Sequence, residues 1–205
     1  MNQTVEQWNF PQRDIQIGIS QCLLGDKVRF DGGHKQSRFC TDTLGKFVNF
    51  VPVCPEMGAG MGTPREAIRL VDREEQGVRV EGNRTGDDYT EALTQFSERA
   101  VERLSHLGGY ILLGKSPSCG MERVKVYSNG VPSRNGVGLF ARGLMKNYPH
   151  LPVEEEGRLE DPHLRENFIQ RVYVYSRWLR LQEQGVNLGA LQNYHARHKY
   201  IFMSH

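Results

Sequence analysis

The sequence predicts an α/β fold in which a mostly parallel, Rossmann-like sheet is flanked by helices. Short apolar segments at residues 15–20 (IQIGIS), 50–53 (FVPV) and 110–113 (YILL) have the length and composition of strands buried in a parallel sheet. Segments with helical periodicity, near residues 87–106 and 139–147, alternate with strands along the chain. Such alternation is typical of an α/β domain.

Local signals refine this prediction. Pro52 lacks a backbone N–H, which favours an edge position for its strand or an early end. The Asn129-Gly130 pair predicts a hairpin turn between residues 124–127 and 131–132. One more strand is expected at residues 151–154.

The chain divides into three regions. Residues 1–12 are expected to be a flexible leader, and residues 13–160 to form the main domain. Residues 161–205 are expected to be helical. The last predicted helix stops on apolar and aromatic residues without a C-cap, so we interpret this extension as a helical linker and the truncated start of a second, all-helical domain.

Composition restricts the classes of function. The chain is 38% hydrophobic and 24% charged, with a formal net charge of +2, which neither requires nor excludes a nucleic-acid partner. No apolar run approaches the ~20 residues of a membrane span, and the N-terminus does not have the pattern of a secretory signal. We therefore expect a cytoplasmic protein with reduced cysteines, no membrane association and no obligate protein partner.

Three of the four cysteines share one position relative to the predicted strands. Cys22, Cys54 and Cys119 each lie just past the end of a strand, and the carboxyl ends of parallel strands meet at one edge of a sheet. Three converging thiolates could hold zinc with one open position, or a four-iron cluster in which one iron lacks a protein ligand. They could also be ordinary core residues. Cys40 does not follow this pattern.

Ordered motifs surround these cysteines, namely residues 20–25 (SQCLLG) with 28–35 (VRFDGGHK), 51–56 (VPVCPE) with 62–65 (GTPR), 115–120 (KSPSCG) and 151–159 (LPVEEEGRL). Together they resemble the thiouracil desulfidase family over about residues 13–160. Three cysteine motifs in a fixed order are far more specific than any single motif. The tail, which contains residues 194–199 (YHARHK), is similar to the start of a helical domain often fused behind this family.

The resemblance implies a [4Fe-4S] cluster held by Cys22, Cys54 and Cys119, with one iron that lacks a protein ligand. It implies the replacement of sulfur by water's oxygen on a thiolated pyrimidine, with release of sulfide and no net redox change. Glu56 and Ser116 match positions with catalytic roles in the family. A carboxylate near the cluster suits proton transfer, but Glu56 could instead be a carboxylate at a helix N-terminus or in a salt bridge. Ser116 could equally be an ordinary turn residue.

Further residues are candidates for substrate binding, each with a structural alternative. The segment of residues 31–35 could present N–H groups and a lysine to a phosphate or base, or could simply be a tight turn. Arg29 and Arg65 could instead pair with carboxylates of the fold, and Ser118 could do no more than shape the loop that carries Cys119. The candidates are Arg29, Asp31, Gly33, His34, Lys35, Arg65 and Ser118.

The substrate interpretation has two forms. The helical extension favours 4-thiouridine in transfer RNA, because the fused form resembles a transfer-RNA desulfidase and a free base would not need a second domain. Free thiouracil is the other form. Two competing hypotheses are a zinc-thiolate hydrolase or deaminase, although the closely spaced ligand pairs of zinc deaminases are absent, and a non-enzymatic RNA-binding module with core cysteines.

Overall fold

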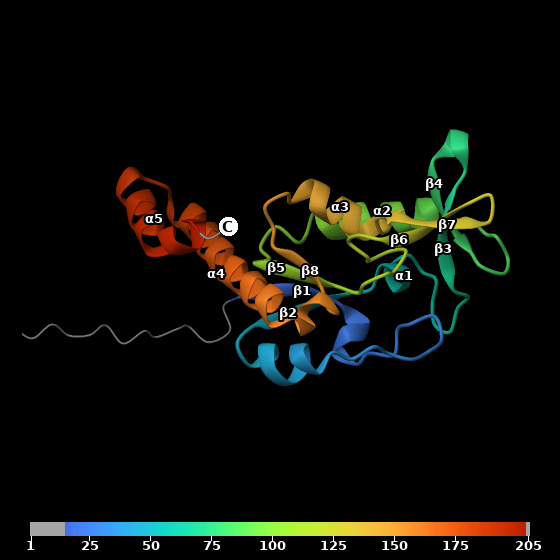
Figure 1. Cartoon of the computed structure of the whole chain (residues 1–205), viewed down its shortest axis with the longest axis horizontal. Coiled ribbons are helices and arrows are strands. Elements are labelled where there is room, and N and C mark those ends of the chain that lie inside the picture. Colours follow the sequence, from blue (N-terminus) through green and yellow to red (C-terminus); the bar gives the residue numbers. More distant parts are fainter. Residues whose placement is uncertain (1–14, 204–205) are drawn as a thin grey trace, which may run out of the picture.

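A computed structural model describes residues 15–203 of the protein (Figure 1). The predicted leader, residues 1–12, lies outside the described residues. Within residues 15–203, no helix is both long enough and apolar enough to cross a membrane.

A four-stranded sheet, sheet A, forms the centre of the molecule. Its order is β2 (Asn49–Val53), β1 (Gln16–Ser20), β5 (Gly109–Leu112) and β8 (Val153–Glu155), and all its strands are parallel. The predicted mostly parallel α/β architecture is therefore confirmed. β2 is an edge strand, as Pro52 predicts.

Helical segments cover both faces of sheet A. On one face, Ile17, Ile19 and Ile111 pack with residues of the short helices η1 (Gln21–Leu24), η2 (Phe39–Thr43) and η3 (Leu44–Lys46). On the other face, residues such as Tyr110 and Leu112 pack against the segment after α2 (Thr90–Val101) and against α3 (Leu139–Asn147). Three layers result, with the strands of sheet A in the middle.

The helical extension begins as predicted. α4 (Pro162–Gln184) follows Asp161, whose carboxylate accepts hydrogen bonds from the N–H groups of His163 and Leu164. Phe168 and Val172 of α4 are buried in the same core cluster as β1. α5 (Leu188–Met203) follows and packs on α4.

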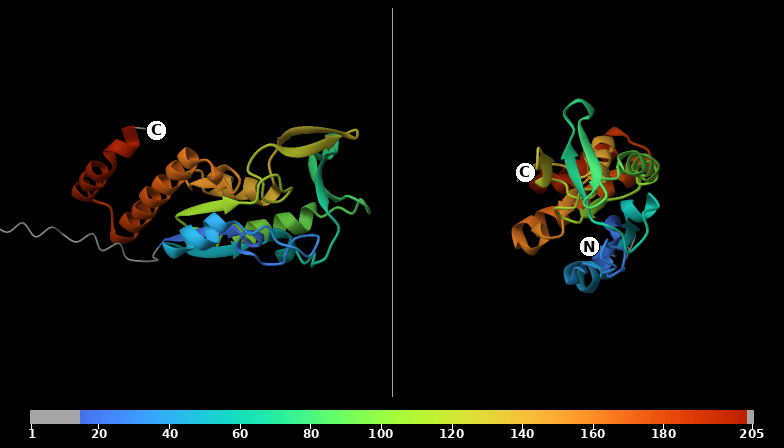
Figure 2. Two further views of the ribbon diagram at one scale, coloured as in Figure 1. Left: turned by 60° about the horizontal axis from the view of Figure 1, so that its bottom comes forward. Right: turned by 90° about the vertical axis from the view of Figure 1, so that its right-hand side faces the viewer.

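A second sheet, sheet B, was not predicted as a separate unit. Its order is β4 (Val78–Gly82), β3 (Ile68–Asp72), β6 (Val124–Ser128) and β7 (Val131–Gly136). The β6–β7 hairpin is the predicted one, and both turn residues have positive φ angles, 51° for Asn129 and 80° for Gly130. Three short helices complete the fold, α1 (Pro55–Gly58), η4 (Glu74–Gln76) and η5 (Arg158–Glu160). Sheet B and α5 lie at opposite ends of the molecule (Figures 1 and 2).

Candidate active site

A cavity of about 370 Å³ lies at the carboxyl edge of sheet A. It forms where the loops after β1, β2 and β5 meet the segment that leads into β3. This is the edge at which parallel α/β sheets collect ligands. The lining residues are 20–22, 28–30, 35, 53–56, 65–68, 113–117 and 119.

Three cysteines from three strand ends line this cavity. Cys22 lies in η1 directly after β1, Cys54 precedes α1 directly after β2, and Cys119 lies in the loop after β5. Cys40 is fully buried in η2 and does not line the cavity. The structure thus brings together the three cysteines singled out by their positions after strands, and leaves the fourth in the core.

Burial raises the pKa of each cavity thiol. The pKa of Cys22 rises to about 11 and that of Cys54 to about 12, in both cases mainly through desolvation. Burial also holds the pKa of Cys119 well above its usual value, and the negative charge of Glu56 acts in the same direction. Without a bound cation these thiols are protonated at neutral pH, and metal binding would release their protons.

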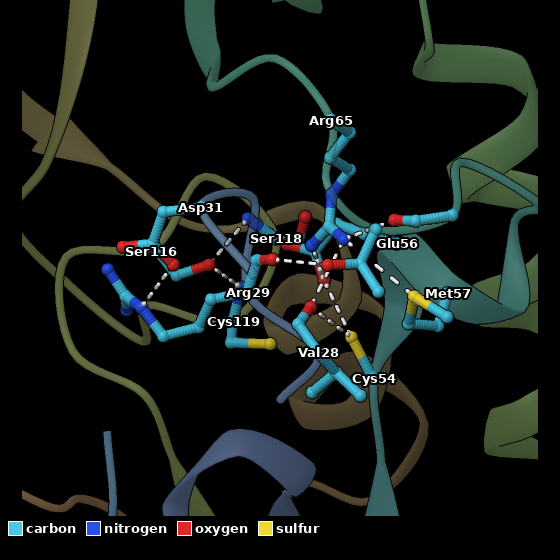
Figure 3. A network of polar contacts seen from close by, with 12 residues as sticks. Val28, Arg29, Asp31, Cys54, Glu56, Met57, Arg65, Ser116, Ser118 and Cys119 are labelled. Carbon is cyan, nitrogen blue, oxygen red and sulfur yellow. Dashed lines mark hydrogen bonds and ion pairs between the residues drawn. The ribbon is translucent and has the colours of Figure 1, made fainter. Parts of the chain in front are cut away.

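Glu56 lies beside Cys54, and the buried side chain of Arg65 lies close to its carboxylate (Figure 3). The Cys54 thiol donates to Glu56 Oε2 over 3.4 Å, and Arg65 Nη2 lies 3.9 Å from the same oxygen. Arg65 Nη1 also donates to the carbonyl oxygens of Val28 (3.1 Å) and Gly62 (2.6 Å). The Arg65 side chain is 9% exposed. It therefore fixes Glu56 and two loops in place, in agreement with the alternative in which this arginine pairs with a carboxylate of the fold.

Ser116 organises the loop that carries Cys119. Its Oγ accepts hydrogen bonds from the N–H groups of Ser118 (3.2 Å) and Cys119 (3.1 Å). This is the turn chemistry that the sequence offered as the alternative role of Ser116. Because the hydroxyl accepts both bonds, its own proton remains available for donation into the cavity, which Ser116 lines.

The other candidates for substrate binding divide into two groups. Arg29 and Lys35 line the cavity, as Arg65 does. The Asp31 carboxylate lies outside the lining, accepts the N–H of Gly33 and lies 3.6 Å from Arg29 Nε. His34 Nδ1 accepts the N–H of Gln36, also outside the lining. The segment is thus a hydrogen-bonded turn that presents Arg29 and Lys35. Ser118 is fully buried outside the lining, and its Oγ has no hydrogen-bond partner among the described residues.

Sequence reasoning missed several residues of the site. Ser20 Oγ accepts the N–H of Leu113 and contacts the Cys119 thiol, joining β1 to the loop after β5. Glu156 accepts Lys35 Nζ (2.7 Å) and the N–H of Gly114 (2.6 Å), so it ties the segment after η1 to that same loop. Ser20 is inside the first cysteine motif and Glu156 inside the last motif, so their position in the motifs is the signal that could have identified them.

The donor set consists of three cysteine thiols, which is the ligand type of an iron–sulfur cluster. Across residues 15–203, no group of three His, Cys, Asp or Glu side chains is arranged to hold one metal ion. A four-iron cluster binds each thiolate through a different iron, and so it takes ligands that are spread around a cavity. The three thiols, drawn from separate loops, fit that requirement.

The fold and the cavity define a three-layer α/β protein with cysteine thiols gathered at the carboxyl edge of its parallel sheet. The 2-thiouracil desulfurase family matches residues 17–156, and the chain belongs to that family. An uncharacterized protein, YbbK of Bacillus subtilis (strain 168), is 29% identical over 114 residues, which covers 51% of this chain and 72% of YbbK. The solved structure of the [4Fe-4S]-dependent thiouracil desulfidase TudS is 28% identical with a TM-score of 0.55, and the match covers 74% of this chain and 95% of TudS.

Proposed function

We propose that this protein is an iron–sulfur-dependent desulfidase that converts a thiolated pyrimidine into its oxo form and sulfide. The observation that carries the proposal is the convergence of Cys22, Cys54 and Cys119 on one cavity that also holds Glu56. Membership of the 2-thiouracil desulfurase family and the likeness to TudS support it. Cys22, Cys54 and Cys119 would be the ligands of a [4Fe-4S] cluster.

The cavity suits such a substrate. Its volume of about 370 Å³ is at the lower end of the range for small-molecule sites, and a bound cluster would take up part of it, so the space left suits a substrate no larger than a single ring. With three thiolate ligands, a bound cluster would have one iron without a protein ligand and so supply a Lewis-acidic position with affinity for sulfur.

The reaction balances without electron transfer. Water supplies the oxygen that replaces sulfur on the ring carbon, so the C=S group and water become C=O and hydrogen sulfide. Glu56 is positioned to accept a proton from water, and Arg65 orients its carboxylate. Ser116 can donate its hydroxyl proton to the pyrimidine. Arg29 and Lys35, at the cavity, would contact the remainder of the substrate.

We propose 4-thiouridine in transfer RNA as the natural substrate, with free thiouracil as the alternative. The resemblance of the helical extension to a fused domain favours the RNA. Incubation of holoenzyme with each substrate separates the two. Loss of sulfur from thiouracil but not from transfer RNA would reverse this preference, and sulfide release without any added reductant is expected if the reaction is non-redox.

An anaerobic iron and sulfide assay tests the cofactor. About four irons for each chain are expected in the reconstituted protein, in line with three thiolate ligands on a four-iron cluster. Cys22→Ala, Cys54→Ala and Cys119→Ala should each lose the cluster. Cys40→Ala is the matched control, because Cys40 is buried outside the cavity. Stoichiometric zinc in place of iron would favour a zinc-thiolate hydrolase, and no metal at all would favour the RNA-binding module.

Glu56→Gln tests the proton-transfer role. We expect it to keep its iron and to lose about 100-fold or more in turnover, because general acid–base groups typically contribute 10²–10⁴-fold. Glu75→Gln, an exposed carboxylate of η4 outside the cavity lining, is the control. Full activity in Glu56→Gln would remove this residue from the mechanism.

A further inference from the structure

Sheet B begins at the rim of the cavity. Residues 65–68, which lead into β3, line the cavity, and so do residues 113–117 and Cys119, which precede β6. β3 and β6 are parallel neighbours, paired through Leu70 and Val126. Both strands therefore leave the cavity at the same end and run away from it side by side.

One face of sheet B is apolar and covered. Leu70, Val80 and Val126 pack in one cluster with Leu93 of α2. Side chains alternate between the two faces of a strand. The residues next to these in sequence therefore point to the other, outer face; they include Arg69, Arg79, Lys125 and Tyr127, together with the buried Val71 and Glu81.

The outer face has a row of cations near its cavity end. Since Leu70 pairs with Val126 in parallel register, Arg69 lies level with Lys125. On β7, Arg134 and Asn135 both lie opposite Lys125, because the register is irregular between the pairs Val124–Gly136 and Val126–Ser133. Lys125 and Arg134 are exposed. Three adjacent strands thus each contribute one cation at nearly the same level.

These three cations are not neutralised within the described part of the chain. Two acidic groups lie close by, one of them Glu81 on β4 directly opposite Arg69, and each already has its own arginine. Glu81 binds Arg73 over 2.6 Å, and Asp88 binds Arg79 over 2.6 Å. Within residues 15–203, no acidic residue forms an ion pair with Arg69, Lys125 or Arg134. This row therefore carries a surplus of positive charge.

An aromatic ring lies within the row. The Arg69 guanidinium lies 5.5 Å from the centre of the Tyr127 ring, and its Nε is buried without a hydrogen-bond partner among the described residues. Stacking on a ring holds the guanidinium in a fixed orientation. A flat surface of oriented cations with an aromatic ring has the chemistry of surfaces that bind single-stranded nucleic acid.

We propose that this surface, here called the basic sheet face (Arg69, Lys125, Tyr127 and Arg134), binds the phosphate backbone of the RNA whose thiolated pyrimidine enters the cavity. The inference rests on the proposed function in its transfer-RNA form. The row crosses three strands that lie about 4.8 Å apart, so it spans about 10 Å, which matches one or two phosphates on one side of the reacting base. Phosphates supply the negative charge that complements the row.

The basic residues of α5 are a weaker choice for this role because of where α5 lies, although His195, Arg197 and Lys199 are exposed. His198 is only 3% exposed and packs against the rings of Tyr194 and Phe202. α5 also lies at the end of the molecule opposite sheet B (Figure 1). Sheet B, by contrast, is continuous with the cavity wall.

Binding of transfer RNA to the full-length apoprotein tests the proposal without the cluster. The test variant is Lys125→Gln with Arg134→Gln, and the control is Lys46→Gln with Lys146→Gln. Lys46 and Lys146 are exposed and precede β2 and β8, so they lie at the opposite edge of sheet A. Both double variants remove the same charge from exposed positions.

Fluorescence anisotropy with 4-thiouridine-containing transfer RNA, measured over a series of salt concentrations, is the readout. We expect roughly a tenfold loss of affinity in the test variant and a salt slope smaller by about 2, one for each phosphate that is no longer neutralised. The control should match the wild type. Equal losses in the two double variants, or no loss in the test variant, would overturn the proposal, and so would wild-type protein without measurable RNA binding.

Activity of the holoenzyme separates this proposal from the proposed function. In the test variant, the ratio of kcat/KM on transfer RNA to kcat/KM on free thiouracil should fall about tenfold, because only the RNA has phosphates for these cations to bind. If wild-type holoenzyme desulfurates neither substrate, the proposed function fails, while the binding comparison still decides the basic sheet face. If it desulfurates thiouracil alone and does not bind RNA, the basic sheet face fails and the desulfidase stands.

Discussion

A glycine allows α3 to approach the backbone of the Cys119 loop. A Cβ atom on Gly138 would lie 2.5 Å from the carbonyl carbon and oxygen of Ser118 and 2.7 Å from the nitrogen of Cys119. The Gly138 N–H donates to Gly120, and the Phe140 N–H donates to the Ser118 carbonyl. The first turn of α3 therefore sets the position of this cysteine.

Gly138→Ala should displace the Cys119 loop, because its new methyl group would meet backbone atoms that belong to the loop itself. We expect substoichiometric iron after anaerobic reconstitution and a lower melting temperature. Gly143→Ala is the matched control, since a Cβ there meets nothing within 4 Å and alanine favours a helix by about 0.5–1 kcal/mol over glycine. Normal iron content in Gly138→Ala would show that the loop can shift without loss of the ligand.

At the scale of residues, sequence indicated the cysteines better than the groups that position them. Cys22, Cys54 and Cys119 each follow a strand, which is a local signal. The contact between Lys35 and Glu156 joins residues 121 positions apart, and no local pattern predicts such a pair. Residues 31–34 show the opposite error. They were candidates for substrate binding, but the Asp31 and His34 side chains mainly make the hydrogen bonds of a turn.

At the scale of elements, α3 has the predicted bounds and α4 begins where the helical extension was predicted to begin, whereas β3 and β4 were missed. α4 has an Asp-Pro start and a glycine stop, both strong signals. β3 (IRLVD) and β4 (VRVEG) alternate apolar with charged residues over only five positions each. The charged residues of β3 and β4 point to one face of sheet B. That face forms only when β6 and β7 pair with β3 and β4, so no local pattern in the sequence predicts it.

Glu66 attaches the start of β3 to a distant turn. Its carboxylate accepts the N–H groups of Arg84 (2.9 Å) and Thr85 (3.1 Å) and the Thr85 hydroxyl. These hydrogen bonds lower the pKa of Glu66 to about 2, with the Thr85 hydroxyl as the largest cause. The bonded form is the ionised carboxylate, so the link should depend on pH.

The pH dependence of this link has a defined sign. Because the pKa falls from 4.5 in the unfolded chain to about 2 in the fold, the stabilisation is fully present above pH 4.5 and is lost as the pH falls toward 2. Glu66→Gln should therefore melt below the wild type at pH 6, and the gap should narrow steadily from pH 4.5 to pH 2. A gap that is constant over this range would mean that the charge of Glu66 contributes nothing. Thermal melts monitored by circular dichroism provide the comparison.

At the scale of the whole molecule, the two helices of the extension are attached very differently. Phe168 and Val172 of α4 are 1% exposed and share a core cluster with β1. α5 contacts α4 through a few groups, including the Tyr194 hydroxyl on the Val174 carbonyl and the Trp178–Tyr194 ring pair. We therefore expect α4 to fold with residues 13–160, and α5 to contribute little to that core.

A pair of phenylalanine substitutions in the full chain tests this division. Phe168→Ala should lower the free energy of unfolding by about 3–5 kcal/mol, the usual loss for a fully buried aromatic ring. Phe202→Ala, at a position 43% exposed on α5, should lower it by no more than about 1 kcal/mol. Urea titration followed by circular dichroism gives both values. Equal losses would mean that α5 shares the cooperative core, and a small loss in Phe168→Ala would mean that α4 is a separable linker. If the predicted difference is found, a chain cut after residue 160 must leave the face of β1 that packs on α4 exposed to water, whereas a cut near Gly185 must not.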